Sequence, residues 1–291
     1  DVYKRQSVTY NVEVATDYAF AYPISGSPFH TTDPTVTTSV TGLSSGTKYY
    51  FRVSATGACT SGYNAIDSTT TNCTAPNQPT AIVFNNTDDT STSVDFTPDA
   101  TAPSGGYLVY RSTAAFTGTP VNGSNYTLGS SLGNGTLVAK GTTSPFAVES
   151  LTANTAYVFT VIPYNTTGCT VSPTYNTVSA LSGTDTTCPS KPVFGSSSHT
   201  SSSITFSWSA GSGGSATTPT YTVDVSTSPS FSSHVSGYPA TSSTSPLTVS
   251  GLSSSTVYYY KVQSVGACTS YALTGSVTTD CVAPNAPNTL T

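Results

Sequence analysis

The sequence contains no methionine, a single tryptophan and few charged residues, which make up 7% of its 291 residues. An average soluble domain has about a quarter of its residues charged, so hydroxyl side chains must provide much of the solubility here. The net charge is −5, and the chain has only eight Lys and Arg residues. Contacts to phosphates require clustered basic residues, so we expect no nucleic-acid partner.

Long apolar segments are also missing. No run approaches the roughly eighteen residues of a membrane-spanning helix, and the amino-terminal segment lacks the apolar core of a signal peptide. The sequence starts in the middle of a repeat without methionine, so we expect a fragment of a longer polypeptide. Residues 1–6, DVYKRQ, fit no repeat and resemble translated sequencing-adapter sequence, so they are left out of the fold prediction.

Aromatic side chains, in contrast, are plentiful. The chain has 19 Tyr and 11 Phe together with many Val residues. Disordered chains are poor in these residue types, so the sequence has enough material for hydrophobic cores.

A repeat organises the chain. The segments GLSSGTKYYFRVSATGAC, SLTANTAYVFTVIPYNTTGC and GLSSSTVYYYKVQSVGAC align, and each is followed by a second cysteine and a proline-containing boundary. The spacing suits one β-sandwich per repeat. We predict a partial domain at 1–75, a domain at 76–188 with an insertion around 117–140, a domain at 189–282 and the start of another at 283–291.

Apolar residues alternate with a period of two within each repeat, as in Tyr49, Phe51 and Val53. This period is typical of half-buried strands, and no sustained helical period occurs. We therefore predict an all-β fold of tandem sandwiches, beads on a string. The intervening side chains are expected to face outward: Tyr50, Arg52, Val158, Thr160, Tyr259 and Lys261.

One recurring motif carries a family resemblance. Leu, then Thr four positions on and Tyr six positions on, occurs in each repeat and gives the tyrosines Tyr49, Tyr157 and Tyr258. The motif resembles the tyrosine corner of fibronectin type III domains, in which the phenol bonds back to the preceding corner. Trp208 and Tyr221 match the family's tryptophan of strand B and tyrosine of strand C, and Phe96 replaces the tryptophan in the second repeat. The resemblance implies that the first repeat lacks strands A and B.

Six cysteines occur as two per repeat. We predict disulfides that staple each F–G hairpin, and such regular pairing indicates an oxidising compartment. The alternative is metal binding, but the chain has no Cys-x-x-Cys spacing and only three His. The predicted pairs are Cys59 with Cys73, Cys169 with Cys188, and Cys268 with Cys281.

Apparent active-site motifs have simpler interpretations. GLSSG at 42–46 matches a nucleophile elbow, but it precedes a strand and is not kept in the other repeats. GSGGS at 211–215 lacks the lysine and helix of a phosphate-binding loop and is predicted to be a flexible B–C loop. The acids at 88, 89, 95 and 99 do not form a calcium loop. We expect no catalysis, cofactor or metal.

Glycosylation is the covalent modification that the sequence suggests. Asn-x-Ser/Thr acceptor sequences occur at Asn72, Asn85, Asn122, Asn125, Asn134 and Asn165. The triplets that contain Ser68 and Thr186 resemble an O-glycosylation motif of exported proteins in some Gram-negative bacteria.

These features predict an extracellular or cell-surface structural repeat region, such as a stalk, an adhesin shaft or a filament subunit. The alternative is a spacer or carbohydrate-binding accessory region of a secreted polysaccharide-degrading enzyme. The expected partners are neighbouring repeats, other copies of the chain in a fibre, and surface glycans.

Overall fold

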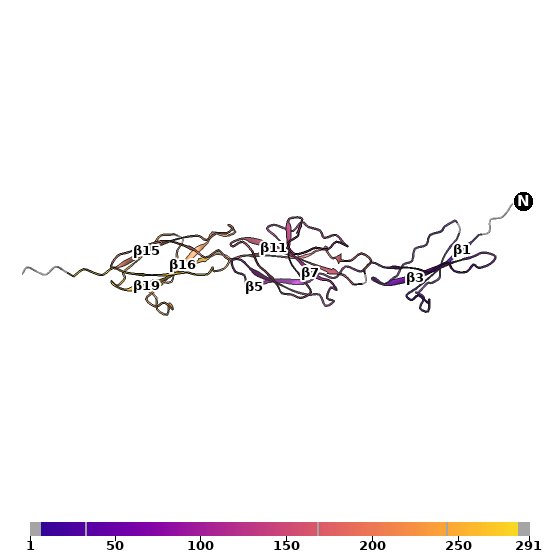
Figure 1. Ribbon diagram of the computed structural model, residues 1–291, viewed down its shortest axis with the longest axis horizontal. Coiled ribbons are helices and arrows are strands. Elements are labelled where there is room, and N and C mark those ends of the chain that lie inside the picture. Colours follow the sequence, from indigo (N-terminus) through magenta and orange to yellow (C-terminus); the bar gives the residue numbers. More distant parts are fainter. Residues whose placement is uncertain (1–6, 33, 168, 243, 285–291) are drawn as a thin grey trace, which may run out of the picture.

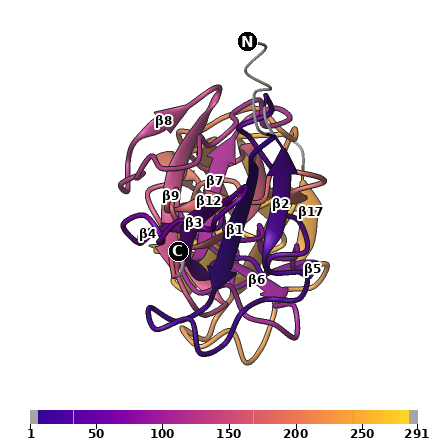
Figure 2. The same ribbon diagram turned by 90° about the vertical axis from the view of Figure 1, so that its right-hand side faces the viewer.

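The computed structural model describes residues 7–32, 34–167, 169–242 and 244–284. The excluded leader 1–6 and most of the predicted start of a further domain, 283–291, lie outside these ranges. The described regular structure consists of strands without any helix, so the predicted all-β fold is confirmed. The strands form three groups in a row along the long axis (Figure 1), and these groups overlap when the molecule is viewed end-on (Figure 2). We call them the first domain (β1–β4), the second domain (β5–β13) and the third domain (β14–β20).

The third domain has the simplest arrangement, a sandwich of two antiparallel sheets. One sheet has the order β14-β15-β18 and the other the order β17-β16-β19-β20. Named by position, these are strands A, B and E in one sheet and C′, C, F and G in the other. Their bounds are β14 Val193–His199, β15 Ser203–Ser209, β16 Thr220–Ser226, β17 Ala240–Ser242, β18 Leu247–Ser250, β19 Val257–Val265 and β20 Leu273–Thr278.

Alternation fixes which side chains enter this sandwich. Burial in β15 and β19 alternates residue by residue, because successive side chains point to opposite faces of a sheet. The buried set includes Phe206 and Trp208 from one sheet and Tyr260 from the other. The rings of Phe206 and Tyr260 stack with their centroids 4.7 Å apart. Burial of each large apolar side chain stabilises the fold by about 1.5–3 kcal/mol.

The second domain repeats this plan with additional strands. One sheet has the order β10-β6-β5, and the other contains β12-β11-β7-β9-β8 with β13 paired to β11. The bounds are β5 Thr80–Asn85, β6 Thr92–Thr97, β7 Gly106–Ser112, β8 Ser131–Leu132, β9 Gly135–Gly141, β10 Phe146–Val148, β11 Ala156–Asn165, β12 Thr174–Tyr175 and β13 Leu181–Thr186.

The extra residues of the second domain cover the outer face of its larger sheet. Tyr110 and Ile162 on that face belong to a second hydrophobic cluster, against which Phe116 and Tyr126 pack. Thr160 lies on this outer face, as predicted, but the extra residues cover the face and leave Thr160 2% exposed rather than in solvent. Its hydroxyl instead lies 2.8 Å from that of Ser182. The second domain thus has an apolar layer on each side of one sheet.

The first domain is a single sheet with the order β2-β1-β3-β4, equivalent to C′-C-F-G. Among residues 7–32 and 34–72, no second sheet faces it. The bounds are β1 Thr9–Ala15, β2 Phe29–Thr32, β3 Lys48–Thr56 and β4 Asp67–Thr70. The domain limits expected from the sequence, at 1–75, 76–188, 189–282 and 283–291, stay predictions. Within the described residues, no helix has the length and apolar character needed to cross a membrane.

Candidate functional site

The predicted corner tyrosines all bond to the chain five residues upstream. Each phenol oxygen accepts a hydrogen bond from a backbone N–H, at 2.8 Å for Ser44 and Tyr49, 2.9 Å for Thr152 and Tyr157, and 3.0 Å for Ser253 and Tyr258. The bond fixes the tight E–F corner at the carboxyl end of each domain. Two residues of each corner adopt a positive φ, and the second of them is Gly46 (60°), Asn154 (48°) or Ser255 (50°).

The disulfides do not lie within the F–G hairpins, so the predicted pairing is wrong. The bridges are Cys73–Cys169 and Cys188–Cys268, with Cα atoms 4.8 and 4.9 Å apart. Each bridge joins the cysteine that follows strand G of one domain to the F–G loop of the next domain. The remaining two cysteines, Cys59 and Cys281, are exposed thiols.

Strand length explains why the predicted cysteine pairs do not form. In the third domain Cys268 precedes β20 and Cys281 follows it. A strand rises about 3.3 Å per residue, so β20 alone holds the two cysteines roughly 20 Å apart. A disulfide requires Cα atoms within about 7 Å, so the two ends of strand G cannot be bridged. The four bridged cysteines instead find their partners across the domain junctions.

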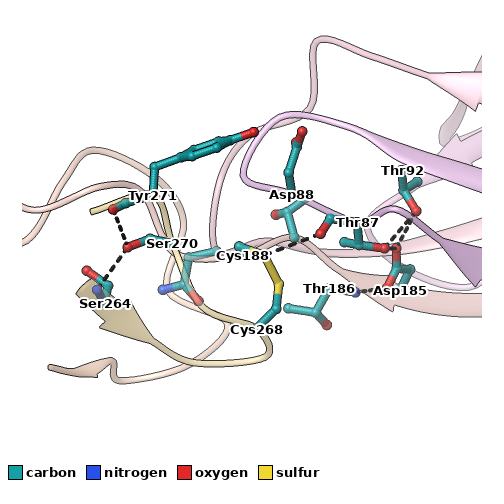
Figure 3. The surroundings of a disulfide bond; sticks show 12 residues. Thr87, Asp88, Thr92, Asp185, Thr186, Cys188, Ser264, Cys268, Ser270 and Tyr271 are labelled. Carbon is teal, nitrogen blue, oxygen red and sulfur yellow. Dashed lines mark hydrogen bonds between the residues drawn. A yellow bond between two sulfur atoms is a disulfide. The ribbon is translucent and has the colours of Figure 1, made fainter. Parts of the chain in front are cut away.

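The junction between the second and third domains is built around Cys188, which is 4% exposed. Its backbone N–H donates to the carbonyl of Asp88 (2.9 Å), and its carbonyl accepts from the N–H of Asn154 (2.9 Å). Cys268 lies in a tight loop in which the N–H of Ser270 donates to the carbonyl of Ser264 (2.8 Å). Figure 3 shows the bridge from this loop to Cys188, which lies beside the turn of the second domain that contains Asp88.

Asn154 connects the two domains without a covalent bond. Its side-chain nitrogen donates to the carbonyls of Gly214 (3.1 Å) and Thr217 (2.9 Å). Its side-chain oxygen accepts from the backbone N–H (3.1 Å) and the hydroxyl (2.7 Å) of Thr217. All four bonds enter the B–C loop of the third domain, and Asn154 is only 7% exposed. The buried amide donates two hydrogen bonds and accepts two, which is its full capacity. It therefore holds the B–C loop in one position.

The glycines of GSGGS allow the B–C loop to approach this corner. The N–H of Gly214 donates to the carbonyl of Ala153 (2.8 Å). A Cβ atom at Gly213 would lie 2.7 Å from the carbonyl oxygen of Ala153, and one at Gly214 would lie 2.8 Å from that of Asn154. The loop that was predicted to be flexible therefore packs against the neighbouring domain.

The junction between the first and second domains uses other side chains. The linker that follows Cys73 lies against the second domain, where Asn165 donates to the carbonyl of Thr74 (3.0 Å) and Asn176 to that of Pro76 (2.8 Å). Gln78 donates to the carbonyls of Asn176 (2.9 Å) and Val178 (3.0 Å). The linker is thus fixed by amide side chains, whereas Gly46, the counterpart of Asn154, has no side chain to contribute.

The predicted glycosylation sites differ in how free their side chains are, and their modification stays a prediction. The side-chain nitrogens of Asn134 and Asn165 donate to backbone carbonyls at 2.9 and 3.0 Å. The oxygens of Asn72 and Asn122 accept hydrogen bonds, from the hydroxyl of Thr170 and the N–H of Tyr175. Among the described contacts, the side chains of Asn85 and Asn125 make no hydrogen bond and are exposed. The predicted O-glycosylation acceptors Ser68 and Thr186 are half-buried in strands.

Asp88 caps a turn of the second domain. The carboxylate of Asp88 accepts from the N–H groups of Thr90 (2.7 Å) and Ser91 (2.6 Å). Burial opposes ionisation of Asp88, but these hydrogen bonds outweigh it, and its pKa lies below the ordinary value. No group of three or more metal-ligating side chains is present in the described part of the chain.

The outer face of the first domain carries an ion pair between two rings. Arg52 donates to Glu13 at 2.9 Å through Nε and at 2.6 Å through a terminal nitrogen. The guanidinium carbon lies 4.2 Å from the ring centroid of Phe20 and 4.0 Å from that of Tyr63. The hydroxyl of Tyr63 also donates to Glu13, and this bond, with Arg52 nearby, holds the pKa of Glu13 below its ordinary value. The arrangement stabilises the sheet locally.

The strand order and the corner define the class of the domains. An A-B-E sheet packed on a C′-C-F-G sheet, with a tyrosine at the E–F corner, is the fibronectin type III fold, and this chain carries such domains in tandem.

Comparisons with known proteins give short or distant similarities. No family model matches the chain. A segment of 77 residues is 39% identical to exoglucanase B of Cellulomonas fimi, and it covers 26% of this chain and 7% of that enzyme. A segment of two fibronectin type III domains from chicken tenascin is 15% identical, covering 70% of this chain and 100% of that one with a TM-score of 0.39. The FN1–FN3 domains of chicken CNTN1 are 14% identical, with coverages of 95% and 90% and a TM-score of 0.29.

The sequence does not identify the residues that form the junction. Asn154 occupies the corner position that is Gly46 in the first domain and Ser255 in the third. Asn and Gly tolerate positive φ, so their occurrence at this position indicates a left-handed backbone conformation. It does not reveal which loop of the next domain Asn154 contacts.

Proposed function

We propose that this chain is a non-catalytic spacer region of an extracellular protein, in which tandem domains form a stalk, an adhesin shaft or a filament. The proposal rests on one observation, which is that both domain junctions are held in a fixed arrangement. At each of the two junctions a disulfide and amide hydrogen bonds fix the linker against the next domain. Fixed junctions between domains in a row keep the two ends of an array apart, which is what a spacer requires.

The extracellular location is supported by the same bridges. Disulfides persist in oxidising compartments and are reduced in most cytosols. The bridges also support a spacer, since they cross the junctions and restrict movement between domains.

Electron microscopy and small-angle scattering of the oxidised chain test the proposal. We expect separate rods whose length matches three domains end to end. Rods that associate into ordered fibres would favour the filament form. Compact or freely bent particles would contradict the proposal, since a hinge at a junction removes the spacing function.

A second candidate, a spacer or accessory region of a polysaccharide-degrading enzyme, is favoured by the match to exoglucanase B. The complete reading frame discriminates the two. A hydrolase domain would favour the second candidate, and further repeats with a surface-anchoring tail would favour the first. Cosedimentation with insoluble cellulose tests the binding function separately, because a chain that stays in the supernatant acts as a spacer only.

A further inference from the structure

The two disulfides close long loops, and these loops contain most of each domain. The bridged cysteines are separated by 96 residues in the pair Cys73–Cys169 and by 80 residues in the pair Cys188–Cys268. The first loop contains strands β5 to β11, and the second contains β14 to β19. Strands A to F of both domains are therefore enclosed by covalent bonds, and strand G lies outside.

A pulling force applied to the two ends of the chain follows the shortest covalent route. From Cys73 it crosses the first bridge to Cys169, continues along the backbone to Cys188, crosses the second bridge to Cys268 and leaves through Cys281. Only the segments 169–188 and 268–281 of this route are backbone that can be straightened. The enclosed strands do not transmit the force.

The straightened segments are held by strand pairing. Strand β13 pairs with β11 from Ala156 opposite Thr186 to Val161 opposite Leu181, and β20 pairs with β19 in the same way. Hydrogen bonds in an antiparallel ladder run perpendicular to the strands. Force along the strand axis therefore displaces all of them together rather than one after another, and strand G resists sliding.

We propose that the junction disulfides form a covalent load path that bypasses strands A to F of the second and third domains and limits how far these two domains can be stretched. An extended residue spans at most about 3.3–3.6 Å, so the two enclosed loops would add about 330 Å and about 270 Å to the unbridged chain. With the bridges closed, segment 169–188 extends to at most about 65 Å and segment 268–281 to about 45 Å. The chain is a tether of limited extension.

The covalent load path goes beyond the proposed spacer function. Its role in the organism rests on that proposal, but the mechanical behaviour of the chain does not. Cys59 and Cys281 occupy the same two positions as the bridged cysteines, in the F–G loop and after strand G. In an array that keeps the same pairing, the route would continue through them into adjoining domains.

Single-molecule force spectroscopy of the whole chain, held by handles at both ends, tests the load path. The chain is stretched to its full contour length before and after treatment with a dithiol. The dithiol gives each bridge two electrons and two protons and leaves as its cyclic disulfide. We expect the fully extended reduced chain to be about 600 Å longer than the oxidised chain. This difference does not depend on whether the variants or the reduced domains stay folded.

Variants assign the gain to each bridge. The double substitution C73S/C169S should lengthen the oxidised chain by about 330 Å, and C188S/C268S by about 270 Å. C59S removes a thiol outside both bridges and should leave the 600 Å difference unchanged. Equal lengths before and after reduction would overturn the load path, and a gain of only about 160 Å would show that the bridges lie within the hairpins instead. The mechanical result stands apart from the proposed function, since a tether of limited extension can be measured even if the parent protein is not a spacer.

Discussion

Asn154 and Thr217 form a two-point contact across the boundary between the second and third domains. One side-chain oxygen of Asn154 accepts from both the backbone N–H (3.1 Å) and the hydroxyl (2.7 Å) of Thr217. Asn154 also needs a positive φ of 48° to enter the corner. Its backbone conformation and its side-chain bonds can therefore be tested separately.

Substitution of Asn154 by glycine should weaken the junction without straining the backbone. N154G reproduces the glycine of the first domain, so it removes the side-chain bonds and keeps the positive φ. We expect the third domain to lose about 2–6 kcal/mol of unfolding free energy, since each of the four lost hydrogen bonds contributes about 0.5–1.5 kcal/mol. Urea unfolding followed by the fluorescence of Trp208, the only tryptophan, measures this loss.

N154A is the matched comparison for this prediction. Alanine removes the same bonds and in addition disfavours positive φ, so it should cost about 1 kcal/mol more than glycine. If N154G unfolds at the same urea concentration as the parent chain, the contact does not stabilise the third domain.

The fold could be predicted because its determinants are local and periodic. Alternation along 257–265 and the spacing of the corner residues need only one strand and one turn to be recognised. The junction could not be predicted in this way, because Asn154 and Thr217 belong to different repeats. The predicted disulfide pairing is wrong for a related reason: the two cysteines of a repeat are close in the sequence, but strand G holds them apart in space. The buried position of Thr160 depends on an insertion that the other repeats lack.

The corner tyrosine Tyr258 should contribute more to the stability of the third domain than the adjacent Tyr259. Tyr258→Phe removes the acceptor of the Ser253 N–H while keeping the ring, so we expect a loss of about 1–2 kcal/mol of unfolding free energy. Tyr259→Phe, on the opposite face of the same strand, is the control and should change stability by less than about 0.5 kcal/mol. Tryptophan fluorescence in urea measures both variants, and equal losses would mean that the corner bond is not specific.

Thiol labelling should distinguish the two classes of cysteine. In the folded, unreduced chain we expect an alkylating reagent to modify Cys59 and Cys281, because both are exposed thiols. The four bridged cysteines should react only after reduction. Peptide mass spectrometry reads out the modified positions. Labelling of Cys73 or Cys268 before reduction would contradict the assignment of the bridges.

Tyr110 should make the second domain sensitive to alkaline pH. Its side chain is 0% exposed, its hydroxyl has no hydrogen-bond partner among the described residues, and burial raises its pKa to about 12. An unfolded tyrosine ionises near pH 10. Between about pH 10 and 12 the unfolded chain therefore releases a proton that the folded chain retains. The unfolding free energy should fall in this range by up to about 1.4 kcal/mol per pH unit.

Tyr110→Phe removes both the ionisable group and the unpartnered hydroxyl. We expect the variant to be as stable as the parent chain or more stable at pH 7, because a buried hydroxyl without a partner costs about 1–3 kcal/mol. Above pH 10 its advantage should grow, since only the parent loses stability through this phenol. Urea unfolding followed by circular dichroism at pH 7, 10 and 11 measures the difference. Tyr126→Phe is the control, because the hydroxyl of Tyr126 accepts from the N–H of Val121 (3.0 Å) and its loss should destabilise the chain at pH 7. A Tyr110→Phe variant that is less stable at pH 7, or whose advantage stays constant above pH 10, would show that the hydroxyl of Tyr110 has a partner in solution.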